Sequence, residues 1–287
     1  MTKATILLIG NCVVDQIWEL EHFPEQDEEM RAMTKTRVLG GNACNSAQIL
    51  AKLGNDVEIV SSLAQDSTAT WLLQQLSAQG IKTRSCIQKS GYSTAESSIW
   101  INTQNGSRTI VHHRDLPELS VAELLQVSLQ EYQWIHFEGR NIDTLITYLS
   151  EIGKPQCPVS LEIEKDRAGF ELLLPFVNTV IVSSAFLNSK NITADQCLED
   201  LSRYNAKLNI VCTLGAAGLV AKDRFGKYIN LNAEKVDKVV DTVGAGDCFI
   251  AGLINSLNQQ EDFETALIAA NQLAAQKIQF KGMNLND

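Results

Sequence analysis

The sequence lacks both the basic clusters of nucleic-acid-binding proteins and the long apolar runs of membrane proteins. Its 24 lysine and arginine residues are outnumbered by 34 aspartate and glutamate residues, giving a formal net charge of -10. No basic cluster is visible, and a surface that binds nucleic acid or an anionic membrane needs one. No apolar run reaches the roughly 18 residues of a membrane-spanning helix. We therefore expect neither nucleic acid nor a membrane as a partner.

Cysteine and histidine are present, but not in patterns typical of a metal site or a disulfide framework. The seven cysteines are odd in number, scattered, and form no Cys-x-x-Cys pair, so neither a disulfide framework nor a zinc site is indicated. The four histidines lack metal-ligand spacing. The apolar run at residues 4–9 is too short for a secretory signal. Reduced thiols and a cytoplasmic location are the expectation.

Several motifs of other nucleotide-binding and catalytic sites are also absent. The sequence has no Gly-x-x-x-x-Gly-Lys-Ser/Thr loop, no protein-kinase motif set and no Gly-x-Ser-x-Gly elbow. A dinucleotide-binding interpretation of Gly244-Ala245-Gly246 fails because Phe249 occupies the third glycine position.

The chain does contain apolar runs that alternate with helical patterns. At 287 residues and 45% hydrophobic content it can bury one large core. Strands alternating with helices predict an α/β fold whose parallel sheet is covered on both faces. The expected strands are Thr5–Ile9, Val57–Ser61, Trp134–Phe137, Val159–Ile163, Thr179–Val182 and Leu208–Cys212. Helical patterns include Asn45–Leu53, Thr70–Ala78 and Phe263–Phe280.

Two regions, 16–39 and 93–113, break this rhythm. Their residues alternate between polar and apolar, and Asn105-Gly106 is a hairpin signal. We expect antiparallel strands there, added to a core formed by residues 1–15, 40–92 and 114–287. The pattern is equally consistent with a lid that excludes water and with an ordinary edge extension.

The most informative stretch is Asp241-Thr-Val-Gly-Ala-Gly-Asp247. The strand-like run Val236–Val240 precedes it and the helical pattern Cys248–Leu257 follows. Glycines at a helix start let backbone amides approach a phosphate. A carboxylate beside that anion repels it, but would be needed to take a proton from an attacking hydroxyl. The alternative, equally favoured by these residues alone, is that Asp247 only caps the helix.

Other polar groups gather at predicted strand ends and helix starts. Asn42 and Asn45 lie one helical turn apart, and Asp15 follows the first strand, so all three could meet sugar hydroxyls. Their alternatives are an N-cap and a turn residue, at even odds. Residues 213–218 place two glycines after another strand, where ligands of α/β proteins bind. Glu162 and Glu164 could hold a metal-nucleotide through water, but we favour a solvated strand end.

The stretches Gly40-Gly41-Asn42-Ala43-x-Asn45 and Asp241-Thr242-x-Gly244-Ala245-Gly246-Asp247, in this order, resemble the two signatures of the ribokinase-like (phosphofructokinase B) sugar kinases. Residues 105–110, 134–141 and 159–165 further resemble its ketohexokinase branch, so the similarity spans nearly the whole chain. The resemblance implies a three-layer α/β/α sandwich with a mainly parallel sheet and a small antiparallel β lid.

The resemblance also implies roles for individual residues. Asp247 would be the catalytic base, and the amides of Gly244, Ala245 and Gly246 would hold the phosphoryl group. The sugar would be bound by Asp15, Gly41, Asn42 and Asn45. ATP would contact Arg108 from the lid, Gly215, Ala216, Ala217 and Gly218 after a strand, and Asn271 in the last helix. Magnesium would arrive with ATP, a potassium ion would sit beside Asp241 and Val243, and the lid would clasp a second subunit in a homodimer.

One departure concerns magnesium. Many members of the family carry Asn-x-x-Glu after the strand that corresponds to residues 179–182, whereas this chain reads Ser183-Ser-Ala-Phe-Leu187. No magnesium-organising residue can be carried over.

The resemblance implies ATP-dependent phosphorylation of a primary sugar hydroxyl, with fructose at O1 as the first expectation. Another ketose, a sugar acid or a nucleoside is the alternative, and a silent sugar-binding regulator the rival from outside the enzymes.

Overall fold

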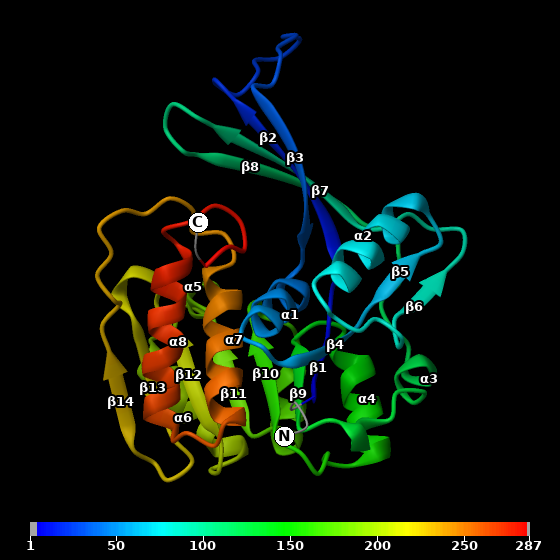
Figure 1. Cartoon of the computed structure of the whole chain (residues 1–287). Coiled ribbons are helices and arrows are strands. Elements are labelled where there is room, and N and C mark those ends of the chain that lie inside the picture. The colour runs from blue at the N-terminus through cyan, green and yellow to red at the C-terminus, as the bar shows by residue number, and fades with distance from the viewer. Residues whose placement is uncertain (1–4, 286–287) are drawn as a thin grey trace.

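The computed structural model describes residues 5–285, and its core is an eight-stranded sheet (Figure 1). The strand order is β14-β13-β12-β11-β10-β9-β1-β4. The strands are β1 (Thr5–Ile9), β4 (Asp56–Val60), β9 (Trp134–Glu138), β10 (Val159–Ile163), β11 (Thr179–Val182), β12 (Asn209–Thr213), β13 (Leu219–Lys222) and β14 (Tyr228–Leu231). The six strands predicted from apolar runs are all present, each within one residue of the predicted bounds.

Six strands of this sheet, β4, β1, β9, β10, β11 and β12, run parallel to one another. Strands β13 and β14 add an antiparallel edge. All five residues of β9 and of β10 are buried, as expected for parallel strands that are covered on both faces. Because the strands are parallel, their carboxyl ends meet at one edge of the sheet, which is where α/β proteins bind ligands.

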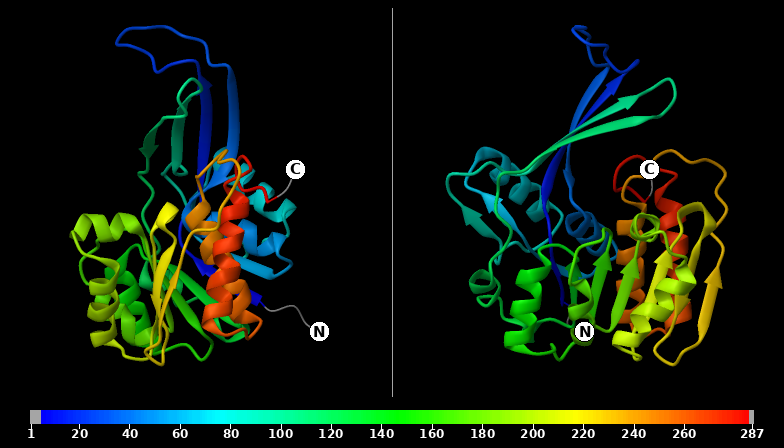
Figure 2. Two further views of the ribbon diagram at one scale, coloured as in Figure 1. Left: turned by 90° about the vertical axis from the view of Figure 1, so that its left-hand side faces the viewer. Right: turned by 180° about the vertical axis from the view of Figure 1, so that it is seen from behind.

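Helices cover the sheet in two layers (Figure 2). One face packs against α1 (Asn42–Lys52), α7 (Ala245–Asn258) and α8 (Phe263–Lys277), and the other against α4 (Ile142–Ile152), η2 (Phe170–Phe176) and α6 (Ala194–Tyr204). Each layer has its own apolar cluster, and burial of apolar side chains on both faces stabilises the sandwich. The elements outside these layers and outside the second sheet are β5 (Ser62–Ala64), β6 (Ile87–Lys89), α2 (Ser67–Ala78), α3 (Val121–Leu124), α5 (Ser184–Lys190), η1 (Leu129–Glu131) and η3 (Gly215–Ala217).

A second sheet projects from the core above the carboxyl ends of the main strands (Figure 1). Its order is β3-β2-β7-β8, from β2 (Val13–Leu20), β3 (Thr34–Gly40), β7 (Glu96–Asn102) and β8 (Arg108–His113). The β2–β3 and β7–β8 pairs are antiparallel, as predicted, whereas β2 and β7 run parallel. Gly106, at φ +70°, lies in the predicted β7–β8 turn.

One predicted strand is wrong. Residues 236–240 adopt no regular structure within the described chain. Val239 and Val240 are 55% and 41% exposed, and the amide of Val240 donates to the carbonyl of Ile278 instead of joining a strand. The apolar run therefore follows the end of α8 rather than an edge of the sheet. In residues 5–285 no helix is both long and apolar enough to cross a membrane.

Candidate active site

The glycine-rich stretch forms the start of α7. Gly244 is its N-cap at φ +76°, a left-handed conformation that favours glycine. A Cβ at Gly246 would meet no atom within 4 Å, so the first turn is open beside this residue. Free amides at a helix start beside open space suit an anion, although the amide of Ala245 already donates a 3.3 Å hydrogen bond to the carbonyl of Thr242. Asp247 lies in this turn, but the capping residue is Gly244, so the interpretation of Asp247 as the helix cap is wrong.

Asp247 is buried and points toward α1. Its side chain is 7% exposed, and Oδ2 accepts a hydrogen bond of 2.8 Å from Nδ2 of Asn45. Burial and the charges of Glu138 and Glu164 raise the pKa of Asp247, the Asn45 hydrogen bond and the charge of Lys277 lower it, and together they place it at about 7. A carboxylate with a pKa near 7 can accept a proton at neutral pH and release it again.

Asn42 contacts carboxylates at the end of β10. Its Nδ2 lies 3.0 Å from Oε1 of Glu162 and 3.3 Å from Oε2 of Glu164. The N-cap of α1 is Gly41, at φ +95°, and not Asn42. Glu162 is 7% exposed, so the expectation of a solvated strand end is wrong for it. The parallel topology brings the end of β10 against the start of α1.

Glu138, which the motifs did not single out, holds the start of α1 in place. Its Oε2 accepts hydrogen bonds from the amides of Asn11 at 2.8 Å and Ala43 at 3.4 Å. A carboxylate stabilises the free amides at a helix start. Burial raises the pKa of Glu138, and these backbone bonds oppose the shift. Its position at the last residue of an apolar strand run was the available sequence signal.

Asp15 lies in β2 and reaches the same region. A Cβ at Gly40 would come 2.1 Å from Oδ2 of Asp15, so the carboxylate lies directly over that glycine, next to Gly41. Burial raises the pKa of Asp15, and the neighbouring Ser97 hydroxyl opposes the shift. The structure thus gathers Asp15, Gly41, Asn42 and Asn45 around the start of α1.

The residues predicted for the nucleotide lie farther along the sheet edge. Gly215, Ala216 and Ala217 form η3 directly after β12. A Cβ at Gly218 would meet the carbonyl oxygen of Leu231 at 2.1 Å, and Asn271 donates a 2.8 Å hydrogen bond to the carbonyl of Asn232. Gly218 and Asn271 therefore both pack against the chain that leaves β14.

Arg108 is not brought to these groups. It is the first residue of β8, where it is exposed and pairs in register with Ile101 of the projecting sheet. Figure 1 shows β8 above the core rather than against it. A contact between Arg108 and a ligand in the core would require this sheet to move.

Comparisons with known proteins identify the family and the fold. The profile of the pfkB family carbohydrate kinases matches residues 3–286. The chain belongs to this family. Ketohexokinase of Mus musculus is 31% identical over 99% of both chains, and 2-dehydro-3-deoxygluconokinase of Haemophilus influenzae is 26% identical over 85% of this chain and 87% of its own. A ribokinase of Arabidopsis thaliana, solved with ribose and ATP, superposes with a TM-score of 0.83 at 20% identity, covering 98% of this chain and 94% of that one.

Membership makes the chain a phosphotransferase with an alcohol as acceptor, of ribokinase-like fold, and implies ATP as the phosphoryl donor. Magnesium would accompany the ATP. In the described residues no group of three or more His, Cys, Asp or Glu side chains is placed to hold a metal directly. Oε2 of Glu162, however, is buried without a hydrogen-bond partner there. An unsatisfied carboxylate oxygen fits the water shell of magnesium.

Potassium does not fit the position expected from the family resemblance. The Nζ of Lys277 lies 2.8 Å from the carbonyl oxygen of Asp241 and 3.3 Å from its Oδ2. The amide of Val243 donates to Oδ1 and that of Gly282 to Oδ2, both at 2.9 Å. The oxygens of Asp241 thus already face a cation and two N–H donors, and a potassium ion at the same oxygens would meet like charge.

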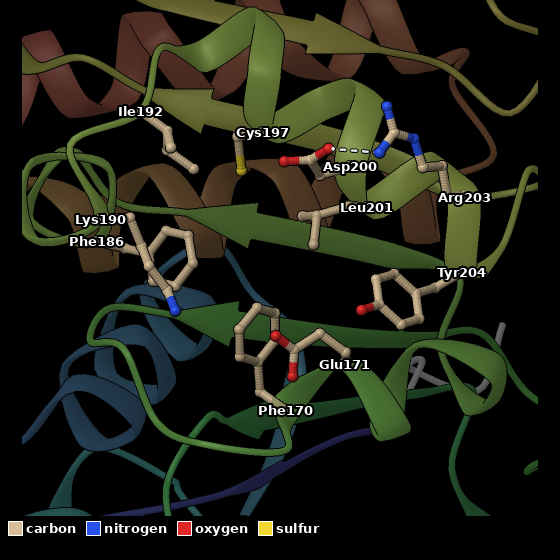
Figure 3. A pocket seen from close by; sticks show the side chains of 10 residues that line it. All are labelled: Phe170, Glu171, Phe186, Lys190, Ile192, Cys197, Asp200, Leu201, Arg203 and Tyr204. Atoms are coloured by element: carbon tan, nitrogen blue, oxygen red, sulfur yellow. Dashed lines mark ion pairs between the residues drawn. The ribbon is translucent and has the colours of Figure 1, made fainter.

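A cavity of about 450 Å³ lies elsewhere (Figure 3). Phe170 of η2, Phe186 of α5 and Leu201 of α6 form its apolar wall, and all three belong to the layer opposite α7. Of the charged side chains at its rim, Lys190 pairs with Asp166 and Arg203 with Asp200. This cavity is separate from the site around Asp247.

Proposed function

We propose that this protein is an ATP-dependent sugar kinase in which Asp247 activates a primary hydroxyl of the sugar. The observation that carries the proposal is the carboxylate of Asp247, buried beside the open helix start at Gly246 and held by Asn45. A silent binding protein has no use for a buried carboxylate at an anion site, where it opposes binding. A base for phosphoryl transfer needs this placement.

The transfer is a direct in-line displacement. Asp247 takes the proton of the sugar hydroxyl while the hydroxyl oxygen bonds to the γ-phosphorus of ATP. The bond from that phosphorus to the bridging oxygen breaks, ADP leaves, and Asp247 returns its proton to solvent. The amides at the start of α7 bind the transferring group, where preorganised donors stabilise developing charge.

The two ligands would approach from different elements. Asp15, Gly41, Asn42 and Asn45 would bind the sugar around the start of α1, which presents both donors and acceptors to hydroxyls. The nucleotide would lie along residues 215–218, with Asn271 bordering it. Bound magnesium would supply charge neutralisation on the phosphates, and Glu162 would hold its water shell.

Fructose, phosphorylated at O1, is the substrate we favour. The support is the ketohexokinase of Mus musculus, related over the full length of both chains. A sugar acid is the second candidate, favoured by the 2-dehydro-3-deoxygluconokinase of Haemophilus influenzae. A nucleoside is less favoured because only 6% of the residues are aromatic, and base recognition uses aromatic stacking.

A substrate panel tests the proposal. ADP release would be measured with ATP and magnesium over ketoses, aldoses, sugar acids and nucleosides, and each product located by phosphorus NMR. We expect the highest kcat/KM for fructose and a product phosphorylated at O1. A higher kcat/KM for a sugar acid or a nucleoside would make that compound the substrate in place of fructose. No turnover with any compound of the panel would overturn the kinase assignment.

The projecting sheet would act as a lid and as a dimer interface. Ile110 and Val111 are adjacent on β8, face opposite sides of the sheet, and are 52% and 58% exposed, so each face of the sheet offers an apolar side chain to a partner. Light scattering should report a homodimer, and Val111→Glu should shift it toward monomer. A monomeric parent protein would contradict the proposed dimer interface.

The seven free cysteines support a reducing, cytoplasmic setting.

A further inference from the structure

Lys277, in the last turn of α8, is a fully buried lysine that no motif predicted. Its side chain is 0% exposed. An ammonium group removed from water is strongly destabilised unless it is paired and hydrogen-bonded. Lys277 therefore needs partners, and its position shows what they are.

In the described chain, the hydrogen-bonding partners of its ammonium group all belong to Asp241. The ammonium contacts both the carbonyl oxygen and Oδ2 of that residue. The carboxylate of Asp241 in turn accepts hydrogen bonds from the amides of Val243 and Gly282. Its own amide donates to the carbonyl of Ile278, the residue after Lys277. Asp241 stands three residues before Gly244, so this network ties the end of α8 to the segment that positions the start of α7.

The charge of Lys277 also reaches the catalytic centre. Its field lowers the pKa of Asp247, against burial and the charges of Glu138 and Glu164, which raise it. The ammonium is thus a fixed positive charge behind a helix start that must accept the negative charge of a phosphoryl group. A side chain on a rigid helix supplies that charge without a binding equilibrium.

We propose that Lys277 is a positioning residue that serves as a built-in cation for the segment 241–246, so that phosphoryl transfer requires no bound monovalent metal ion. The inference rests on the proposed kinase activity. It follows from the burial of the ammonium and from its occupation of the oxygens of Asp241 that a potassium ion would need.

The first test uses the unaltered protein. Activity and thermal unfolding would be measured in choline chloride and then with KCl replacing it at constant ionic strength. We expect kcat to change less than about twofold and the Tm to be the same in both salts. A large activation by potassium, or a Tm raised by KCl over choline, would overturn the proposal. If no sugar were phosphorylated, the proposed function would fail, while the Tm comparison would still test this inference.

The second test removes the ammonium. Lys277→Ala should lower kcat by about 10- to 100-fold, the range of one lost charge-assisted contact, with KM for sugar and ATP nearly unchanged. Ethylammonium or potassium chloride should restore part of kcat, because either cation can enter the vacated space, whereas choline should not. The matched control is Lys238→Ala, since Lys238 is exposed and lies three residues before this segment. Parental kcat in a folded Lys277→Ala protein, or a loss that neither cation relieves, would contradict the proposal.

Discussion

Asn45 and Asp247, 202 residues apart in sequence, are joined by a 2.8 Å hydrogen bond from the amide of Asn45 to Oδ2 of Asp247. The bond connects the first turns of α1 and α7, the two helices that carry the family signatures. It orients the carboxylate and stabilises its charged form, because the amide can only donate from Nδ2. The two signatures therefore meet in the fold.

The pH dependence of catalysis should report this contact. With a pKa of about 7, Asp247 is a base only when deprotonated, so kcat/KM should fall tenfold per pH unit below about pH 7 and level off above it. Asn45→Ala removes a bond that lowers this pKa, and the acid limb should move to higher pH. The control is Ser46→Ala, because Ser46 bonds to the main-chain oxygen of Asp247. An unmoved limb in Asn45→Ala would show that another group titrates.

Substitutions at two glycines of the same turn should have different effects, one on phosphoryl transfer and the other on stability. Gly246→Val adds atoms where nothing lies within 4 Å, so the fold should keep its Tm while phosphoryl transfer to every sugar weakens. Gly244→Ala puts a Cβ on a residue at φ +76° and 2.5 Å from Sδ of Met283, so stability should fall by ~1–2 kcal/mol. Thermal unfolding and kinetics on both variants separate the effects. A loss for one sugar only in Gly246→Val would contradict a phosphate role.

Sugar and nucleotide binding should respond to different residues. Asp15→Ala should weaken sugar binding by about 1.5–3 kcal/mol, the value of a hydrogen bond to a charged group, and leave ATP affinity unchanged. Arg108→Ala should weaken ATP binding or turnover by a similar amount only if the projecting sheet closes. Calorimetric titration with each ligand alone and with both measures this. Intact sugar binding in Asp15→Ala with lost nucleotide binding would reverse the assignment.

Burial of Asp247 should cost stability at neutral pH. Its pKa is about 7 in the fold and near 3.9 unfolded, so the native state holds a proton that the unfolded state has lost. Stability therefore falls as pH rises from about 4 to 7. Asp247→Asn removes this term, so its advantage over the parent should grow with pH and reach up to about 4 kcal/mol above pH 7. Urea unfolding at several pH values measures it, and a pH-independent difference would contradict the shift.

The main sheet was predictable because strands such as β9 and β10, buried on both faces, read as continuous apolar runs. The local pattern was misleading at residues 236–240. The amide of Val240 donates to the carbonyl of Ile278 instead of pairing in a sheet, and the side chains of Val239 and Val240 remain exposed. The parallel pairing of β2 with β7 joins segments about 80 residues apart, which alternation along each strand does not specify.

The candidate site was predictable as far as its motifs reach. Asp247, Asn42 and Asn45 were identified from helix starts beside glycines. Glu138 and Lys277 were missed because each acts through tertiary contacts, with Asn11 and Ala43 in one case and Asp241 in the other. A carboxylate or an ammonium in an apolar run signals burial, but only the fold supplies its partner.

The kinetics of Asp247→Asn test the central claim most directly. Asparagine keeps the shape of the side chain and its oxygen can still accept the bond from Asn45, but it cannot take a proton. We predict that kcat for sugar phosphorylation falls by ~10²–10⁴ in a variant that is folded and at least as stable as the parent at pH 8, with sugar and ATP affinities within about threefold. A variant that turns over at the parental rate would contradict the assignment of Asp247 as the base.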